Sequence, residues 1–218
     1  MPTSMFTRVG AMLLTIAALA VGVAACGDDS SDGSTSTDDV KPVAEIAELS
    51  GVDTSVALDQ GFLDALEQLK VTPAPAGDAT LKGTDISFPI TGGNVTYYDP
   101  SSPVRPYVQG TIDHDGSGLT LTAGKTEVEL SDFVIDPGES TLSGTVSVNG
   151  KEAANDALLF DLDGTTLEPL KTNSDGSATL TGTTVKLADS AADLLNETFG
   201  IKDLQGGLVI GVSTITVK

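Results

Sequence analysis

The sequence predicts a mainly β fold, an antiparallel sandwich or barrel, with an N-terminal helix and one late amphipathic helix. From about residue 80 onward, apolar and polar residues alternate with a period of two, which is typical of half-buried strands. Turn-forming pairs such as Asn149-Gly150 and Asp175-Gly176 separate these runs. Two other stretches repeat their apolar residues at helical spacing instead. Many short strands joined by tight turns favour antiparallel pairing.

The first helix is expected within residues 43–69, where helical spacing is weak at first and then clear. The apolar side of its second half consists of Leu58, Phe62, Leu63, Leu66 and Leu69. Asp53 or Thr54 could cap this helix, and Pro73 and Pro75 would end it.

A series of strands is expected after this helix. The candidate ranges are residues 80–90, 94–98, 104–112, 118–122, 126–135, 141–148, 157–162, 179–187 and 208–217. One interruption has helical spacing, with apolar residues Ala188, Ala191, Leu194, Leu195 and Phe199. This segment predicts a second amphipathic helix that covers one end of the sheet.

The chain is strongly acidic, with 31 Asp and Glu residues against 11 Lys and Arg residues and a formal net charge of −20. Such a charge repels phosphate backbones and anionic lipid head groups. We therefore expect no nucleic-acid partner, and any membrane attachment must come from something other than a basic patch.

The segment Val23-Ala24-Ala25-Cys26 holds the only cysteine of the chain and follows an apolar stretch, residues 9–25. This stretch is close in length to a secretory signal core and short for a spanning helix, although an uncleaved membrane anchor remains the alternative. The arrangement resembles a bacterial lipoprotein signal. The resemblance implies that Cys26 receives diacylglycerol and palmitate-like acyl chains and holds the protein at the extracytoplasmic face of the cell membrane.

Three parts are expected along the chain. Residues 1–25 are a lipoprotein signal peptide, residues 26–41 are the lipidated cysteine with a disordered acidic tether, and residues 42–218 are a single β domain. The tether is assigned because it lacks aromatic residues and large aliphatic clusters, so it cannot bury enough apolar surface to fold.

The run Leu158-Leu159-Phe160-Asp161-Leu162-Asp163-Gly164-Thr165 resembles the first motif of haloacid-dehalogenase-type phosphatases. The resemblance implies Asp161 as nucleophile and Asp163 as general acid beside a magnesium ion. The segment that follows reads strand, helix, strand, whereas that family needs an alternating series of strands and helices. A surface hairpin with a tight Asp-Gly turn is therefore the favoured interpretation.

The acidic segment Asp113-His114-Asp115-Gly116 resembles half of a calcium loop, but the glutamate that an EF-hand requires is missing. A β-turn is the favoured interpretation, with His114 as an exposed loop residue. If calcium does bind, the candidate ligands are Asp113, Asp115, Asp161 and Asp163. A lone histidine cannot form a multi-histidine zinc site.

The run Val104-Arg105-Pro106-Tyr107-Val108-Gln109-Gly110 and the alternating strands after it are similar in rhythm to HtaA-type haem-binding β-domains. This resemblance implies Tyr107 as the iron ligand and His114 as its support. The tryptophan of that family is absent from this chain. The alternative is that Tyr107 is an ordinary strand aromatic with a solvated hydroxyl.

These observations favour a non-catalytic binding or structural module of the cell envelope, with no cofactor and with an unknown ligand or protein partner. No motif meets the structural requirements of a catalytic site. Haem or calcium binding is the alternative, followed by a metal-dependent phosphatase at Asp161 and Asp163. A deep apolar pocket would direct the search toward lipids or other hydrophobic molecules.

Overall fold

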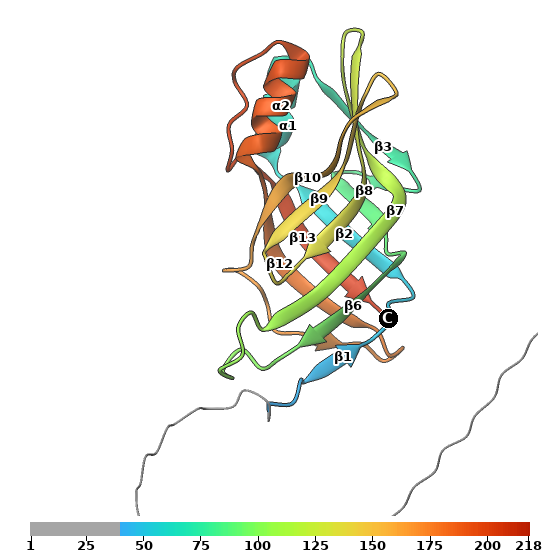
Figure 1. Cartoon of the computed structure of the whole chain (residues 1–218), viewed down its shortest axis with the longest axis vertical. Coiled ribbons are helices and arrows are strands. Elements are labelled where there is room, and N and C mark those ends of the chain that lie inside the picture. The colour runs from blue at the N-terminus through green and yellow to red at the C-terminus, as the bar shows by residue number, and fades with distance from the viewer. Residues whose placement is uncertain (1–39) are drawn as a thin grey trace, which may run out of the picture. The chain divides into compact units, whose positions relative to one another are not determined.

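The computed structural model describes residues 40–218, so the expected signal peptide and Cys26 lie outside the described residues. Within this range the chain forms one antiparallel sheet of 13 strands that curls on itself into a half-barrel (Figure 1). The mainly β class with two helices is confirmed. Of the two expected architectures, the curled sheet corresponds to the barrel.

The strands run along the chain as follows. They are β1 (Ala44–Ile46), β2 (Val52–Leu58), β3 (Thr72–Gly77), β4 (Thr80–Lys82), β5 (Asp85–Pro89), β6 (Gly92–Tyr97), β7 (Val108–Ala123), β8 (Thr126–Asp136), β9 (Thr141–Val148), β10 (Lys151–Asp163), β11 (Lys171–Thr172), β12 (Ala178–Leu187) and β13 (Val209–Val217). Their order in the sheet is β1-β6-β7-β8-β9-β10-β12-β13-β2-β5-β4, with β11 on β12 and β3 on β7.

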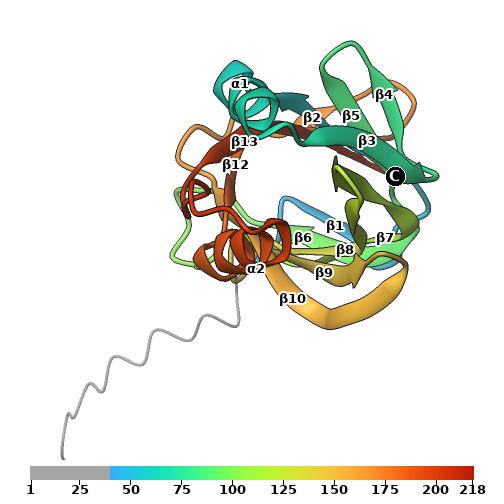
Figure 2. The ribbon, with the colours of Figure 1, turned by 90° about the horizontal axis from the view of Figure 1, so that it is seen from above.

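The curl brings strands that are distant in this order to opposite sides of one interior, as the view along the half-barrel shows (Figure 2). It also brings β5 into contact with β7. Alternate residues of each strand point inward, and Val128, Val146 and Leu159 are among the most deeply buried apolar side chains. The core therefore lies inside the curl.

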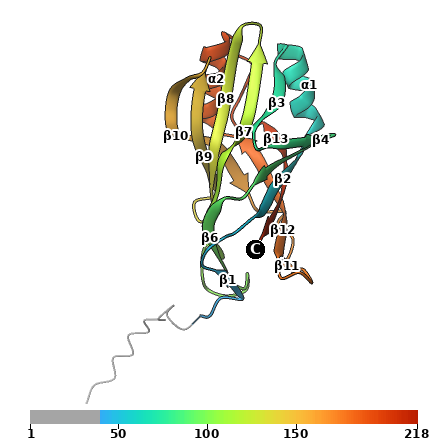
Figure 3. The ribbon, with the colours of Figure 1, turned by 90° about the vertical axis from the view of Figure 1, so that its right-hand side faces the viewer.

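Two helices lie at the same end of the half-barrel (Figure 3). Helix α1 (Gln60–Leu69) begins after Asp59, whose Oδ1 accepts a 2.8 Å hydrogen bond from the backbone N–H of Gly61. Helix α2 (Asp189–Phe199) ends at Gly200 in the left-handed conformation, with φ of 68°. The late helix is confirmed over its expected residues. No helix within residues 40–218 is long and apolar enough to cross a bilayer.

The expected start of the first helix was wrong. Residues 44–46 and 52–58 form β1 and β2, and Asp53 and Thr54 lie in β2, so Asp59 caps α1 in their place. The burial of β2 alternates with a period of two, because Thr54 and Val56 point inward while the neighbours face out. The apolar residues of this segment fit both a helical period and a period of two, so their spacing allows a helix or a strand. Pairing with β5 and β13 makes the segment a strand.

Two further expectations need correction. The expected strand 104–112 begins only at residue 108, and together with the expected strand 118–122 it belongs to one long strand, β7. The expected turn at Asp115-Gly116 is a bulge, where the pairing of β7 with β8 shifts register. Helix α1 ends at Leu69, ahead of the prolines, with Lys70 as its C-cap in the left-handed conformation. Pro73 and Pro75 follow the helix and lie within β3. Proline is tolerated there because β3 pairs in the sheet only with β7.

Candidate functional site

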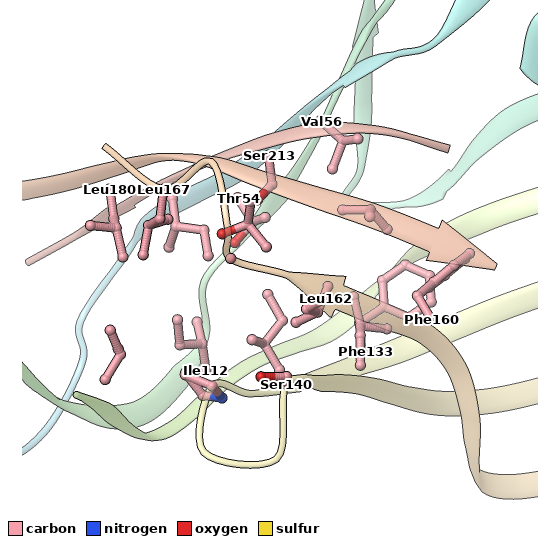
Figure 4. A pocket seen from close by; sticks show the side chains of 18 of the residues that line it. Thr54, Val56, Ile112, Phe133, Ser140, Phe160, Leu162, Leu167, Leu180 and Ser213 are labelled. Carbon is pink, nitrogen blue, oxygen red and sulfur yellow. The ribbon is translucent and has the colours of Figure 1, made fainter. Parts of the chain in front are cut away.

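The curled sheet encloses a cavity of about 480 Å³ (Figure 4). Its volume lies in the range of small-molecule sites, which is about 300 to 1,000 Å³. Its wall is mostly aliphatic and aromatic. The apolar side chains include Val56, Leu58, Ile86, Phe88, Val95, Ile112, Leu119, Phe133, Ile135, Leu142, Phe160, Leu162, Leu167, Leu180, Val185, Ile210, Ile215 and Val217.

Strand alternation places these side chains in the wall. On β10, Phe160 and Leu162 line the cavity while Asp161 between them is exposed. On β8, Phe133 and Ile135 line it in the same way. The period-two pattern of the sequence thus produces the apolar lining, and the curl of the sheet leaves the space between the walls.

The cavity is closed at one end and open at the other. Leu119, Phe160 and Ile210 belong both to its wall and to a small apolar gap beneath α1 and α2, so the helices cover this end. The exposed lining residues all lie in loops outside the strands and helices. They are Arg105, Pro106, Ser140, Gly164 and Thr165. These loops form the mouth.

A small polar cluster interrupts the apolar wall. It consists of Thr54, His114 and Ser213, which are 4 %, 1 % and 3 % exposed. Thr54 and Ser213 lie on the neighbouring strands β2 and β13 and appear close together in Figure 4. Ser213 Oγ takes part in none of the hydrogen bonds described within residues 40–218. The cluster therefore offers a hydroxyl to a ligand in the cavity.

Both ring nitrogens of His114 have protein partners. Nδ1 lies 3.1 Å from the carbonyl oxygen of Phe133, which can only accept, so we assign the ring proton to Nδ1. Nε2 then accepts a 2.8 Å hydrogen bond from Thr54 Oγ1. Burial lowers the pKa of His114 to about 4, against its ordinary 6.5, so the ring is neutral at neutral pH.

The expectation of an exposed His114 was therefore wrong. The residue follows Ile112 by two positions on the same strand, and both side chains point into the half-barrel. This two-residue spacing after an apolar strand residue was the signal in the sequence. The adjacent Asp115-Gly116 pair concealed it by suggesting a turn.

Tyr107 lies in the bend before β7, half-buried at the cavity wall. Its ring packs edge-on against Tyr97, with the ring centroids 6.0 Å apart and the planes at 87°. Tyr107 and His114 thus line the same cavity, as a haem site would require. His114 does not hydrogen-bond to Tyr107, because its two ring nitrogens bond to Phe133 and Thr54 instead.

Asp161 and Asp163 lie on the outer side of β10, away from the cavity wall that Leu162 contributes. Asp163 Oδ2 lies 2.7 Å from Lys186 Nζ, and its Oδ1 accepts from the backbone of Thr165. These hydrogen bonds hold the pKa of Asp163 well below its ordinary value. A general acid needs a pKa near the working pH, so this environment acts against that role.

The candidate calcium ligands do not gather. Asp113 and Asp115 flank the inward-facing His114 and so lie on the outer face of β7. Within residues 40–218 there is no group of three or more His, Cys, Asp or Glu side chains that could hold a metal ion. The bulge in β7 is instead held by a 2.9 Å hydrogen bond from the Gly116 N–H to Asp132 Oδ1.

No family model matches this chain, and no curated protein matches it. Two solved structures share its fold. The C-terminal domain of HtaA from Corynebacterium glutamicum has a TM-score of 0.51 at 11 % identity, covering 78 % of this chain and 97 % of that one. The heme binding protein HtaB from the same organism has a TM-score of 0.52 at 11 % identity, covering 80 % and 96 %. At these identities the likeness shows the fold, and it agrees with the HtaA-type resemblance in the sequence.

Proposed function

We propose that residues 42–218 form a non-catalytic binding domain that holds a hydrophobic small molecule inside the half-barrel. The observation that carries this proposal is the cavity of about 480 Å³ with an apolar wall and an open mouth. Protein interiors are normally packed with few voids larger than a water molecule. The side chains around an empty space of this size lose van der Waals contacts unless a ligand supplies them, so the cavity favours a binding role.

The polar groups of the wall favour binding over catalysis. Thr54 and His114 form a hydroxyl–imidazole pair, but the orienting group at Nδ1 is the backbone carbonyl of Phe133. A base with a pKa of about 4 is poorly matched to proton abstraction near neutral pH. The pair therefore joins two walls of the cavity rather than activating a nucleophile.

Haem is the second candidate ligand, and the position of Tyr107 in the cavity wall favours it. One of the two proteins that share this fold, HtaB, is described as a heme binding protein. A bound haem would supply an iron centre, for which a tyrosine oxygen is a known axial ligand. Tyr107 would hold that iron without help from His114, whose ring nitrogens are occupied.

The cavity is tested with the neutral hydrophobic dye Nile red and two matched tryptophan variants. Leu162→Trp places a large ring in the cavity, whereas Val212→Trp places one on the outer face of β13, where Val212 is 42 % exposed. We expect saturable dye binding in the wild type and in Val212→Trp and its loss in Leu162→Trp. Absence of saturable binding to the wild type would refute the proposal, as would equal binding by both variants.

We further propose that this domain works at the extracytoplasmic face of the cell membrane, attached through lipid on Cys26. The support is the Val-Ala-Ala-Cys signal and the acidic segment after it. An anchored domain with a hydrophobic cavity would receive its ligand from the envelope.

A further inference from the structure

We infer that the ligand is an acyl chain with an anionic head group, and that Arg105 binds this head group at the mouth of the cavity. The inference rests on the proposed function and specifies its ligand class. Among the residues from 40 to 218 that line the cavity, Arg105 is the only charged one. The chain has 31 acidic and 11 basic residues, yet the described part of the wall contains an arginine and no carboxylate. The charge at this cavity is therefore opposite to that of the chain as a whole.

The guanidinium of Arg105 is held in place by backbone carbonyl groups of its own loop. Nη1 donates to the carbonyl oxygens of Ser102 and Val104 at 2.7 and 2.6 Å. Nη2 donates to the carbonyl oxygen of Pro100 at 2.9 Å. These three bonds fix the side chain before any ligand arrives, which lowers the entropic cost of binding.

The same guanidinium keeps hydrogen-bonding capacity for a ligand. It has five N–H donors, so three bonds to carbonyl groups leave the Nε–H and one N–H of Nη2. Within residues 40–218 Arg105 forms no ion pair. Paired N–H groups of arginine match the two oxygens of a carboxylate or phosphate.

The rest of the cavity determines the other end of the ligand. Behind the mouth, the wall is mostly aliphatic and aromatic as far as Leu119, Phe160 and Ile210 beneath the helices. The cluster of Thr54, His114 and Ser213 interrupts it. A small inorganic anion would leave this surface without contacts, and a fully apolar molecule would not use the arginine. An acyl chain with a carboxylate or phosphate at one end satisfies both.

The experiment compares cis-parinaric acid, a fluorescent fatty acid, with its uncharged methyl ester on the purified full chain. We expect the wild type to bind the acid roughly five- to tenfold more tightly than the ester, in keeping with a charge-assisted hydrogen bond at a partly solvated site. In Arg105→Gln this ratio should fall to about one. Lys125→Gln removes one positive charge from an exposed position outside the cavity wall and should keep the wild-type ratio.

The possible outcomes distinguish a failure of this inference from a failure of the proposed function. Equal binding of acid and ester by the wild type would overturn the anionic head group and leave a hydrophobic-ligand domain in place. A preference for the acid that persists in Arg105→Gln would overturn the role of Arg105. Binding of neither compound by the wild type would overturn the proposed function and this inference together.

A second measurement applies if Arg105→Gln does not fold. The ratio for the wild type is then followed against salt concentration, because an exposed ionic contact weakens as salt screens it. A falling ratio supports the contact, and a ratio independent of salt contradicts it. Competition by oleic acid and by lysophosphatidic acid then shows whether the site prefers a carboxylate or a phosphate.

Discussion

His114 Nε2 accepts a 2.8 Å hydrogen bond from Thr54 Oγ1, and this bond joins β7 to β2 across the interior of the half-barrel. The two strands are not neighbours in the sheet, since β8, β9, β10, β12 and β13 lie between them. The second ring nitrogen binds the carbonyl oxygen of Phe133 on β8. One buried imidazole therefore ties together the two sides of the curl beside the cavity.

Replacing Thr54 by valine should destabilise the fold by about 1–3 kcal/mol, because it leaves the buried Nε2 of His114 without its donor. Valine keeps the shape of threonine, so the loss reports the hydrogen bond rather than a cavity. Urea unfolding followed by circular dichroism measures it. Ser213→Ala is the matched control, since it removes a neighbouring buried hydroxyl that takes part in no described hydrogen bond. Equal effects of the two substitutions would show that the cross-cavity bond is not a stabilising contact.

Stability should decline as the pH falls from about 6.5 to about 4. Burial lowers the pKa of His114 to about 4 in the folded protein, whereas an unfolded histidine has its ordinary pKa of 6.5. Between these values the unfolded chain binds more protons, so acidification favours unfolding, by about 3 kcal/mol over the whole window. Urea unfolding at pH 7, 5.5 and 4.5 measures the decline.

The variant His114→Asn provides the control for this pH dependence, because it removes the titrating group. Its free energy of unfolding should change less than that of the wild type between pH 7 and 4.5. The carboxyl groups of Asp99, Asp163 and Asp175 have lowered pKa values, so their contribution is lost at more acidic pH, below about 4. Identical slopes in the two proteins would exclude His114 as the source.

The regular strands of this fold could be predicted from local alternation, but the cavity could not. The range 141–148 was predicted with its bounds as found in β9, and the late helix was placed correctly. These segments pair with sequence neighbours or carry a single clear period. The apolar spacing of Val52–Leu58 predicts a helix, whereas pairing with β5 and β13, which lie elsewhere in the chain, makes it a strand.

The site residues illustrate the same limit. The resemblance to HtaA-type domains points to Tyr107 and His114, and both residues line the cavity. Thr54 and Ser213 carried no local signal, because their neighbourhood arises only when β2 and β13 pair. Whether inward side chains meet or leave a space depends on how far the sheet curls. The curl is a property of the whole sheet, so the sequence of a single strand does not predict it.

If haem is the ligand, mixing hemin with the purified protein should give a defined Soret band that Tyr107→Ala abolishes. The expectation follows from the position of Tyr107 in the cavity wall. Tyr98→Ala is the control, because Tyr98 lies near it in sequence and does not line the cavity. A Soret band that survives in Tyr107→Ala would exclude Tyr107 as the iron ligand. Absence of a band in the wild type would remove haem and leave the acyl-chain ligand as the candidate.

Cys26→Ala should block lipid attachment and leave the protein unprocessed. The cysteine follows Val23-Ala24-Ala25 at the end of an apolar segment, and it is the only cysteine in the chain. A single thiol cannot form an internal disulfide, and the proposed lipidation gives this cysteine another role. Radiolabelled palmitate fed to the producing bacterium should label the wild type and leave Cys26→Ala unlabelled. Ser30→Ala, in the acidic segment just after the signal, should be labelled like the wild type. Equal labelling of Cys26→Ala and the wild type would show that the anchor is elsewhere.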